Sequence, residues 1–214
     1  MHCVVAVLFF GIASGTVDYR GRATVKDVLD FFSTGQPIVL ARRSYNRYID
    51  ELEPRCIKTI VTKRDNTSLW FNQSYIYGKK GVEESMVGHV MKKPGMDSAP
   101  VMIVERAWDL EKGHLTGNHV ANERNEQAHF LGRAPAHDPG IDYTSFRIYN
   151  FEYYDEREKC AVISFMEKSC FIKCEFHIWL TGGSGSYHNC LLEYEYLCGH
   201  RKYYNLYNPR DCKF

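Results

Sequence analysis

The stretch that decides the fold is residues 145–180, SFRIYNFEYYDEREKCAVISFMEKSCFIKCEFHIWL. Three runs within it, residues 145–154, 160–166 and 171–180, are rich in Val, Ile, Tyr and Phe. These residue types pack well on a pleated surface, and polar segments separate the runs. The stretch therefore predicts three consecutive β-strands.

The same pattern continues toward the N-terminus. Further strand-like runs cover residues 38–44, 56–63, 68–77, 85–92 and 101–106. Together with the first three they make eight, which suits an antiparallel up-and-down barrel. Closure removes exposed strand edges, and a barrel of eight strands can hold one small ligand. A β-sandwich is the alternative on pattern alone.

Two helices flank the predicted strands. Residues 24–32 space Val25, Val28, Leu29 and Phe32 at helical intervals, and Thr24 with Asp27 forms a capping pattern. A second helix is expected at about residues 189–199. The fold class predicted is thus mostly β, with an N-terminal and a C-terminal helix.

Composition excludes several classes of protein. The chain has 214 residues, 27 of them basic and 26 acidic, and aromatic residues make up 14%. Disordered chains are poorer in aromatic residues and more one-sided in charge. The absence of a basic excess argues against a nucleic-acid partner. No segment after the first fifteen residues approaches the length of apolar sequence that crosses a bilayer, so we expect no membrane partner.

The first fifteen residues resemble a processing segment. An apolar run, CVVAVLFFGIA, ends in small residues, with Ala13 and Gly15 placed for a cut before Thr16. We interpret residues 1–15 as a secretory signal peptide and residues 16–214 as the mature domain, located outside the cell. Two N-x-S sequons, at Asn66 and Asn72, then become expected glycosylation sites that face solvent.

Secretion also changes how the cysteines are interpreted. Of the eight cysteines, Cys3 leaves with the signal peptide, and seven remain. An oxidising compartment favours disulfides. Because seven is odd, at least one thiol is free or pairs with another molecule. No C-x-x-C pair occurs, so the cysteines predict no zinc site.

A long polar insertion, residues 107–142, interrupts the strand pattern and carries four of the nine histidines. The spacing of His114, His119, His129 and His137 matches no standard metal site. The segment GGSGS at 182–186 lacks the final glycine of a nucleophile elbow. We therefore expect no bound metal, no cofactor and no enzymatic activity.

Several motifs together resemble one family. In order along the chain they are DVLDFFSTGQPI (27–38), Cys56, WFNQSY (70–75), YDE followed by KCAV (154–162), Cys174 followed by Trp179, CLLEYEYLCG (190–199) and YNPRDCK (207–213). This series resembles the tick salivary lipocalins, specifically the histamine-binding-protein group. Members are secreted barrels that capture small mediators of the host. The resemblance spans nearly all of the mature chain except the insertion.

The resemblance implies a set of disulfides. Carried over by position, the pairs are Cys56–Cys212, Cys160–Cys190 and Cys174–Cys198. Cys170 is then the odd cysteine. It is either a buried free thiol or a link to another molecule.

The family's amine-binding signature departs in this chain. The two positions that carry pocket carboxylates in the family are Ala161 and His177 here. Strand alternation nevertheless places Glu175, His177 and Trp179 on one face. A shifted amine site on Glu175 with aromatic faces is one interpretation, because a buried ammonium needs a charge partner or rings. An outward or salt-bridged Glu175 is the other.

Alternation also predicts the rest of the ligand-binding wall. A glycan on Asn72 points outward, which turns the phase of Leu69, Phe71, Gln73 and Tyr75 inward. We take the aromatic phase of residues 145–154 as inward too. The predicted ligand-binding residues are Phe71, Tyr75, Tyr149, Phe151, Tyr153, Glu175, His177 and Trp179. The competing interpretation is that these rings fill the barrel and leave no cavity.

The expected function is sequestration of a small host mediator to suppress host defence. A biogenic amine, histamine or serotonin, is the first candidate implied by the resemblance. A lipid mediator or sterol is the alternative, because the family's two carboxylates are missing. A third alternative is a lipocalin that binds a host immune protein. A basic patch of Arg42, Arg43 and Arg47 suggests either an anionic ligand or partner, or a solvated strand end.

Overall fold

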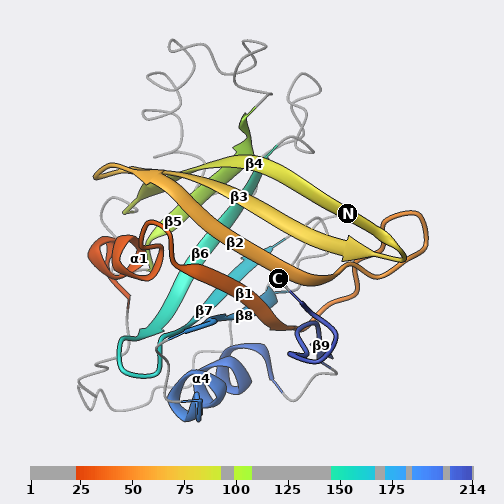
Figure 1. Cartoon of the computed structure of the whole chain (residues 1–214). Helices are drawn as coiled ribbons and strands as arrows, with labels where there is room; N and C mark the ends of the chain where they lie inside the picture. Colours follow the sequence, from red (N-terminus) through yellow and green to blue (C-terminus); the bar gives the residue numbers. More distant parts are fainter. Residues whose placement is uncertain are drawn as a thin grey trace, which may run out of the picture.

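The computed structural model describes residues 23–92, 99–107, 146–166, 172–181, 185–199 and 203–213. The predicted signal peptide, the four histidines of the insertion and Cys170 lie outside these residues. Figure 1 shows the arrangement of the elements. Their bounds are α1 (Val25–Phe31), β1 (Pro37–Arg43), β2 (Arg55–Arg64), β3 (Ser68–Tyr77), β4 (Lys80–Met91), β5 (Val101–Arg106), β6 (Phe146–Asp155), β7 (Cys160–Met166), β8 (Ile172–Trp179), α4 (His188–Cys198) and β9 (Tyr204–Asn205).

The strands form a closed antiparallel barrel. Hydrogen-bonded neighbours run in the order β2-β3-β4-β5-β6-β7-β8-β1, and β1 also pairs with β2. Every one of these pairs is antiparallel. The return pairing of β1 with β2 closes the ring, so no strand of the eight is left with an open edge. The predicted eight-stranded barrel is confirmed, and the sandwich alternative is wrong.

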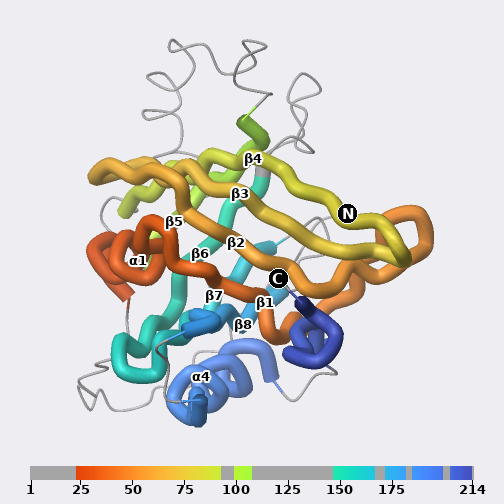
Figure 2. Tube along the Cα trace, in the orientation of Figure 1, coloured from red at the N-terminus to blue at the C-terminus, as the bar shows by residue number. Residues whose placement is uncertain are grey.

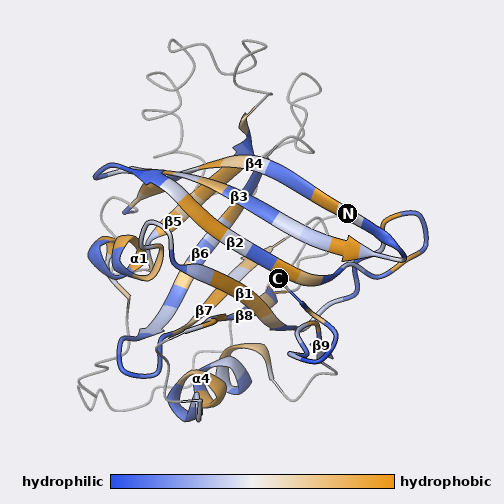
Figure 3. Cartoon of the chain, in the orientation of Figure 1, coloured by the Kyte–Doolittle hydropathy of each residue, from blue (hydrophilic) through white to orange (hydrophobic). Residues whose placement is uncertain are grey.

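One strand starts earlier than the sequence predicts. We expected a strand at residues 85–92, but β4 begins at Lys80 and ends at Met91. Gly78 adopts a positive φ of 59°, which permits the tight turn that places Lys80 opposite Tyr77. The first half of β4 is hydrophilic, as Figure 3 shows. Pairing with β3, rather than residue type, holds it in the sheet.

Two apolar layers lie on the two sides of the barrel wall. The inner layer includes Val28 and Phe31 of α1 together with Leu69, Phe71 and Phe151 from the strands. The outer layer packs β1, β7 and β8 against α4, which lies beside these strands in Figure 2. Disulfides Cys160–Cys190 and Cys174–Cys198 join β7 and β8 to this helix. Both have the pairing that the family resemblance implied.

A buried carboxylate fixes the start of α4. Glu158, in the turn before β7, accepts hydrogen bonds from the backbone N–H groups of His188 (2.9 Å) and Asn189 (3.0 Å). It satisfies donors that a helix start leaves open. Glu158 also lies close to Cys160 and Cys190, but these two cysteines are bonded to each other, which rules them out as thiolate metal ligands.

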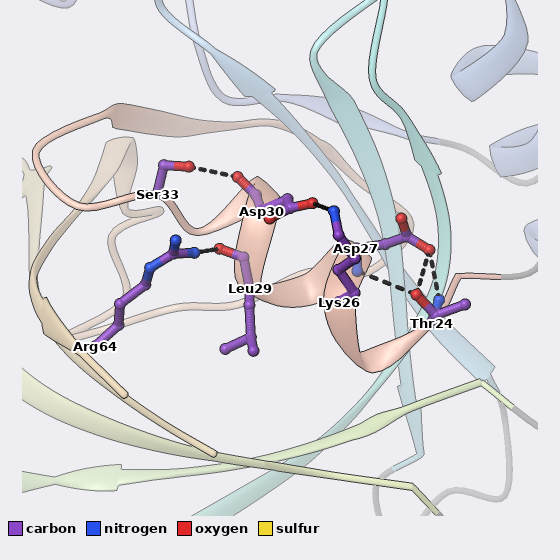
Figure 4. Close-up of polar contacts among 7 residues, drawn as sticks. All are labelled: Thr24, Lys26, Asp27, Leu29, Asp30, Ser33 and Arg64. Carbon is purple, nitrogen blue, oxygen red and sulfur yellow. Dashed lines mark hydrogen bonds and ion pairs between the residues drawn. The ribbon is translucent and has the colours of Figure 1, made fainter. Parts of the chain in front are cut away.

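Helix α1 packs against one end of the barrel. Phe31 has no exposed surface, and its backbone oxygen accepts a hydrogen bond of 3.0 Å from the indole Nε1 of Trp179. Thr24 and Asp27 form the predicted capping box. Arg64 reaches from β2 to the backbone oxygen of Leu29, as Figure 4 shows. These contacts hold the helix against the strands, with Phe31 in the inner layer.

The C-terminal tail completes the wall where β1 and β2 separate. The Leu206 N–H donates to the Ala41 oxygen (3.0 Å), and the Cys56 N–H donates to the Leu206 oxygen (2.9 Å). The disulfide Cys56–Cys212, again the pair implied by the resemblance, ties the tail to β2. Among the described residues, no helix has the length and apolar character needed to span a membrane.

Candidate functional site

Strand β8 separates two environments by simple alternation. Cys174, Phe176 and Ile178 belong to the outer layer under α4. Trp179 packs against the inner layer, and Glu175 and His177, in the same phase, are buried on that inner side. The prediction that Glu175, His177 and Trp179 share one face is confirmed. Glu175 does not point outward to solvent, but it lies at salt-bridge distance from His177, as the alternative interpretation allowed. A strand carries its residues to alternate sides, so the cysteine positions fix the direction of the others.

Glu175 is a buried carboxylate with two donors. Its Oε2 atom lies 3.0 Å from Nε2 of His177, and its Oε1 atom accepts a hydrogen bond from the Tyr45 hydroxyl. Burial by itself would raise the pKa of Glu175, but these hydrogen bonds and the charge of Arg147 lower it to about 2. The carboxylate is therefore ionised at neutral pH, inside the barrel.

Arg147 and Tyr149 project from β6 beside this carboxylate. Arg147 Nη1 lies 3.2 Å from the Tyr149 hydroxyl oxygen, to which it donates. The guanidinium carbon of Arg147 lies 5.0 Å from the ring centre of Phe165, within reach of a cation–π contact. Burial, together with the charge of Glu175, raises the pKa of Tyr149 to about 12. Tyr149 thus stays a neutral hydroxyl at neutral pH.

Tyr45 connects these groups. Its ring packs edge-on against Phe165, with 5.2 Å between ring centres. The ammonium of Lys173 lies 5.2 Å from the Tyr45 ring centre, and the guanidinium of Arg43 lies 5.4 Å from it. Burial and the charge of Glu175 raise the Tyr45 pKa above its usual value. We call Tyr45, Arg147, Tyr149, Glu175 and His177 the polar cluster.

The polar cluster lies toward the end of the barrel opposite α1. β1 begins at Pro37, just after α1, and ends at Arg43, which pairs with Glu175. β8 runs the other way, so Trp179 is the residue that meets α1 while Lys173 lies at the far end. The interior therefore has an apolar end packed by α1 and a charged, aromatic end.

The other residues predicted to line the ligand-binding wall do not all lie in one part of the structure. Phe71 and Phe151 are buried in the inner layer, and Phe151 contacts Phe31 of α1. Tyr75 instead packs in a smaller cluster with Leu40, Ile57 and Leu206 of the tail. The structure thus brings Tyr149, Glu175 and His177 together, whereas Tyr75 packs against Leu40, the residue of β1 that pairs with His177.

Tyr153 corrects the prediction from alternation. We expected it to point inward with Tyr149 and Phe151, but it packs in the outer layer with Val162 and α4. The pairing of β6 with β7 shifts register between Phe151 and Tyr153. Such a bulge inserts one extra residue and reverses the phase beyond it. Tyr154, not Tyr153, therefore meets the inner layer, where its ring contacts Phe31.

The two positions that the resemblance marks for carboxylates are neighbours in the sheet. Ala161 of β7 pairs directly with His177 of β8, and Ala161 is fully buried in the inner layer. Glu175 pairs with Ile163 one in-phase step along the same strands. The only acid that β8 places on its inner face is therefore Glu175, beside the family positions rather than on them.

The basic patch of the sequence is split by the wall. Arg42 lies over the ring of Tyr203, 4.7 Å from its centre, on the outside. Arg43 is fully buried, with Nη2 3.0 Å from the Glu53 carboxylate and 3.2 Å from the Arg47 backbone oxygen. The interpretation as a solvated strand end is wrong for Arg43, because pairing with β8 turns it inward opposite Glu175.

Sequence reasoning missed Tyr45, Phe165, Arg147 and Lys173 as members of this environment, and named Arg43 only within the basic patch. Arg147 could have been found, because it shares the phase of Tyr149 and Phe151 in one strand. Tyr45 follows β1 in an irregular segment, where no periodicity indicates direction.

A separate pocket lies on the outside of the barrel. It has a volume of about 210 Å³ and is lined by Lys26, Leu29, Asp30, Arg64, Asp65 and Asn66. Figure 4 shows several of these side chains between α1 and β2. None of the predicted ligand-binding residues lines it.

Of the comparisons with known proteins, the one with solved structures gives matches. No protein-family model matches the chain, and no curated protein does. Twelve chains of solved structures match. One of them is japanin from Rhipicephalus appendiculatus bound to cholesterol, with 14% sequence identity, a TM-score of 0.47, and coverage of 84% of this chain and 97% of that chain.

Proposed function

We propose that this protein is a secreted, non-catalytic lipocalin that sequesters a small host mediator inside its barrel. The observation that carries the proposal is the polar cluster, an ionised Glu175 among aromatic rings in the interior of a closed barrel. Burying charged groups costs free energy that apolar packing would avoid. Such groups in an enclosed interior are typical of ligand sites.

Secretion and glycosylation are part of this proposal. Three disulfides join described cysteines, and such bonds persist in oxidising compartments. Together with the apolar segment at residues 1–15, they support export. Capture in this way is stoichiometric and requires no cofactor. A role in binding a host protein through the insertion concerns residues outside the described part of the chain.

An amine is the first ligand class to test. Glu175 faces inward and is ionised, so its carboxylate could pair with an ammonium. The rings of Tyr149 and Phe165, 5.3 Å apart, would offer aromatic faces. An entering ammonium would have to replace Tyr45 or His177, which now donate to both carboxylate oxygens.

A lipid mediator is the second class, and a specific observation favours it. Arg147 and Lys173 bring two positive charges to the same end of the interior as Glu175. An acidic head group would find cations there, and the rings would contact its apolar part. A neutral sterol would use the rings alone.

Calorimetric titration of the secreted full chain with histamine, serotonin and a leukotriene tests the proposal. Saturable binding of one ligand per chain is the expected result. If an amine binds, Glu175→Gln should weaken it at least tenfold, because the ammonium loses its counter-charge. Absence of binding to any of them, with no small molecule found by native mass spectrometry of the purified protein, would contradict capture.

A further inference from the structure

We propose that the pocket on the outside of the barrel, between α1 and β2, binds the first N-acetylglucosamine of a glycan on Asn66. The inference rests on the glycosylation that belongs to the proposed function, and it adds where the sugar lies and what it stabilises. Ligand capture inside the barrel does not depend on it. Its basis is that Asn66, a predicted glycan acceptor, forms part of the pocket wall.

The lining of this pocket suits a neutral, polar ligand. Its charges balance, since two cations, Lys26 and Arg64, are matched by two carboxylates, Asp30 and Asp65. Cations donate hydrogen bonds and carboxylates accept them, so together they serve the hydroxyl and acetamide groups of a sugar. Leu29 adds apolar surface for the C–H groups of the ring. The volume, about 210 Å³, is below the roughly 300–1,000 Å³ of pockets for drug-sized ligands, which favours a single sugar residue.

Both carboxylates keep an oxygen for the sugar. The ammonium of Lys26 pairs with Oδ2 of Asp30. The backbone N–H groups of Thr67 (2.8 Å) and Ser68 (2.6 Å) donate to Oδ1 of Asp65, as does the Thr67 hydroxyl. Within the described part of the chain, the second oxygen of each carboxylate accepts no hydrogen bond. A sugar hydroxyl therefore finds two acceptors that the protein does not use.

The attachment point is held at the edge of the pocket. The hydrogen bonds from Thr67 and Ser68 to Asp65 fix the turn that carries Asn66. The Asn66 side chain is exposed, and among the described residues it makes no hydrogen bond. Its amide nitrogen is therefore open to glycosylation, and the sugar begins next to the pocket. Tethering confines the sugar to an effective concentration of about millimolar, so weak contacts suffice for docking.

A docked sugar bridges two parts of the fold. Leu29 and Asp30 belong to α1, whereas Asn66 lies in the turn between β2 and β3. Arg64, the last residue of β2, already reaches the backbone oxygen of Leu29 (Figure 4). α1 has seven residues, and helices shorter than about 12–15 residues are marginal without tertiary contacts. The sugar therefore adds to the contacts that hold Phe31 in the inner layer.

The test compares forms of the secreted full chain that differ in the sugar on Asn66. In an Asn72→Gln background, expression in cells that make high-mannose glycans, followed by endoglycosidase H, leaves one N-acetylglucosamine on Asn66. Asn66→Gln in the same background supplies the sugar-free form. The N–H groups of Val28 and Phe32, which donate to the Thr24 and Val28 oxygens, should exchange with solvent about threefold more slowly when the sugar is present. Amides of α4 should exchange equally in both forms.

Lys26→Ala tests the assigned pocket. The Lys26 side chain is 81% exposed, so its removal should leave the fold intact while deleting one donor of the lining. The slowing caused by the sugar should fall about twofold in this variant, because residues in contact do not act additively. Lys80→Ala is the matched control, since Lys80 pairs with Tyr77 at the end of β3 away from Asn66, and it should keep the full effect. An equal effect in both variants would refute the assigned lining.

A direct contact is the second readout. In the form with one N-acetylglucosamine, a nuclear Overhauser effect is expected between the acetamide methyl group and the Leu29 methyl groups. Equal exchange of the α1 amides in the two forms, with no such contact, would show that the sugar stays in solvent and would refute the inference. Slowing by the full high-mannose glycan, but not by a single N-acetylglucosamine, would assign the effect to the outer sugars and refute the pocket.

Failure of this inference is distinguishable from failure of capture. Glycopeptide mapping that finds no glycan on Asn66 would overturn the sugar site, together with the glycosylation that it rests on. Titrations with histamine, serotonin and a leukotriene report on the barrel interior and are unaffected by that result. Absence of binding in those titrations would in turn leave the exchange of the α1 amides as the measure of the sugar site.

Discussion

Nε2 of His177 lies 3.0 Å from a carboxylate oxygen of Glu175, two residues away on the same face of β8. The two side chains meet because residues two apart in a strand point to the same side. Tyr45 supplies the second donor to this carboxylate from outside the strand. The pair therefore depends on both local alternation and a contact that only the folded chain makes.

Glu175 makes stability depend on pH. Its pKa is about 2 in the folded protein against a usual 4.5, so its contribution is present above about pH 4.5 and is lost as pH falls toward 2. A shift of this size corresponds to about 3 kcal/mol.

Urea unfolding at pH 7 and pH 2.5 should show that Glu175→Gln loses less stability over this interval than the wild type. Glu195→Gln, on the exposed side of α4, is the control and should behave as the wild type does. Identical pH dependence in wild type and Glu175→Gln would contradict the ionised, paired carboxylate.

Tyr149 and Tyr153 form a matched pair for ligand binding. Tyr149 lies in the polar cluster, whereas the bulge in β6 turns Tyr153 to the outer layer. For whichever ligand the titrations identify, Tyr149→Ala should weaken binding about tenfold, equivalent to about 1.4 kcal/mol. Tyr153→Ala should change affinity less than twofold, although it should lower the unfolding temperature. Equal effects of the two substitutions on affinity would mean that the bulge does not separate the faces.

Of the three disulfides, Cys56–Cys212 should contribute most to the stability of the C-terminal tail. It closes a span of 156 residues, against 30 for Cys160–Cys190 and 24 for Cys174–Cys198. Replacing both Cys56 and Cys212 by Ser should cost about 2–5 kcal/mol. Because Leu206 bridges β1 and β2, limited proteolysis should also cut the tail faster in this variant. A tail that stays protected would show that its backbone hydrogen bonds suffice.

The two sequons should differ in occupancy. Asn66 is exposed beside Asp65, whose carboxylate holds the turn through the N–H groups of Thr67 and Ser68. The amide of Asn72 donates to Glu83 (2.9 Å) and accepts from Ser85 (3.0 Å) in the middle of the sheet. Glycopeptide mapping of protein secreted by insect cells should find Asn66 more fully glycosylated. Asn66→Gln should therefore change the mass more than Asn72→Gln, and the reverse order would refute this prediction.

Much of the barrel could be predicted from residue type alone. Alternating Val, Ile, Tyr and Phe marks strands because a pleated surface buries one face of each. That is why β7, β8 and the shared face of Glu175, His177 and Trp179 follow from the printed sequence. The first half of β4 could not be predicted, because its residues are hydrophilic and only the register with β3 places them in the sheet.

The candidate site was only partly accessible to the same reasoning. Phase along one strand is reliable until a bulge occurs, and nothing in the residues of β6 marks the extra residue before Tyr153. The direction of Arg43 could not be predicted, because it depends on the pairing of β1 with β8, which places Arg43 opposite Glu175.

The sequence by itself determined most of the segments that become strands, the helix start that Thr24 caps, and the residues of β8 that share a face with Glu175. These properties are local, since they depend on propensity and on a period of two residues. Only the tertiary structure decided that Tyr45 and Arg43 gather at Glu175 and that Tyr153 turns away. Those outcomes depend on the register between strands that are distant in the chain. Backbone hydrogen bonds set this register, and because every residue has the same backbone groups, the register cannot be inferred from residue types.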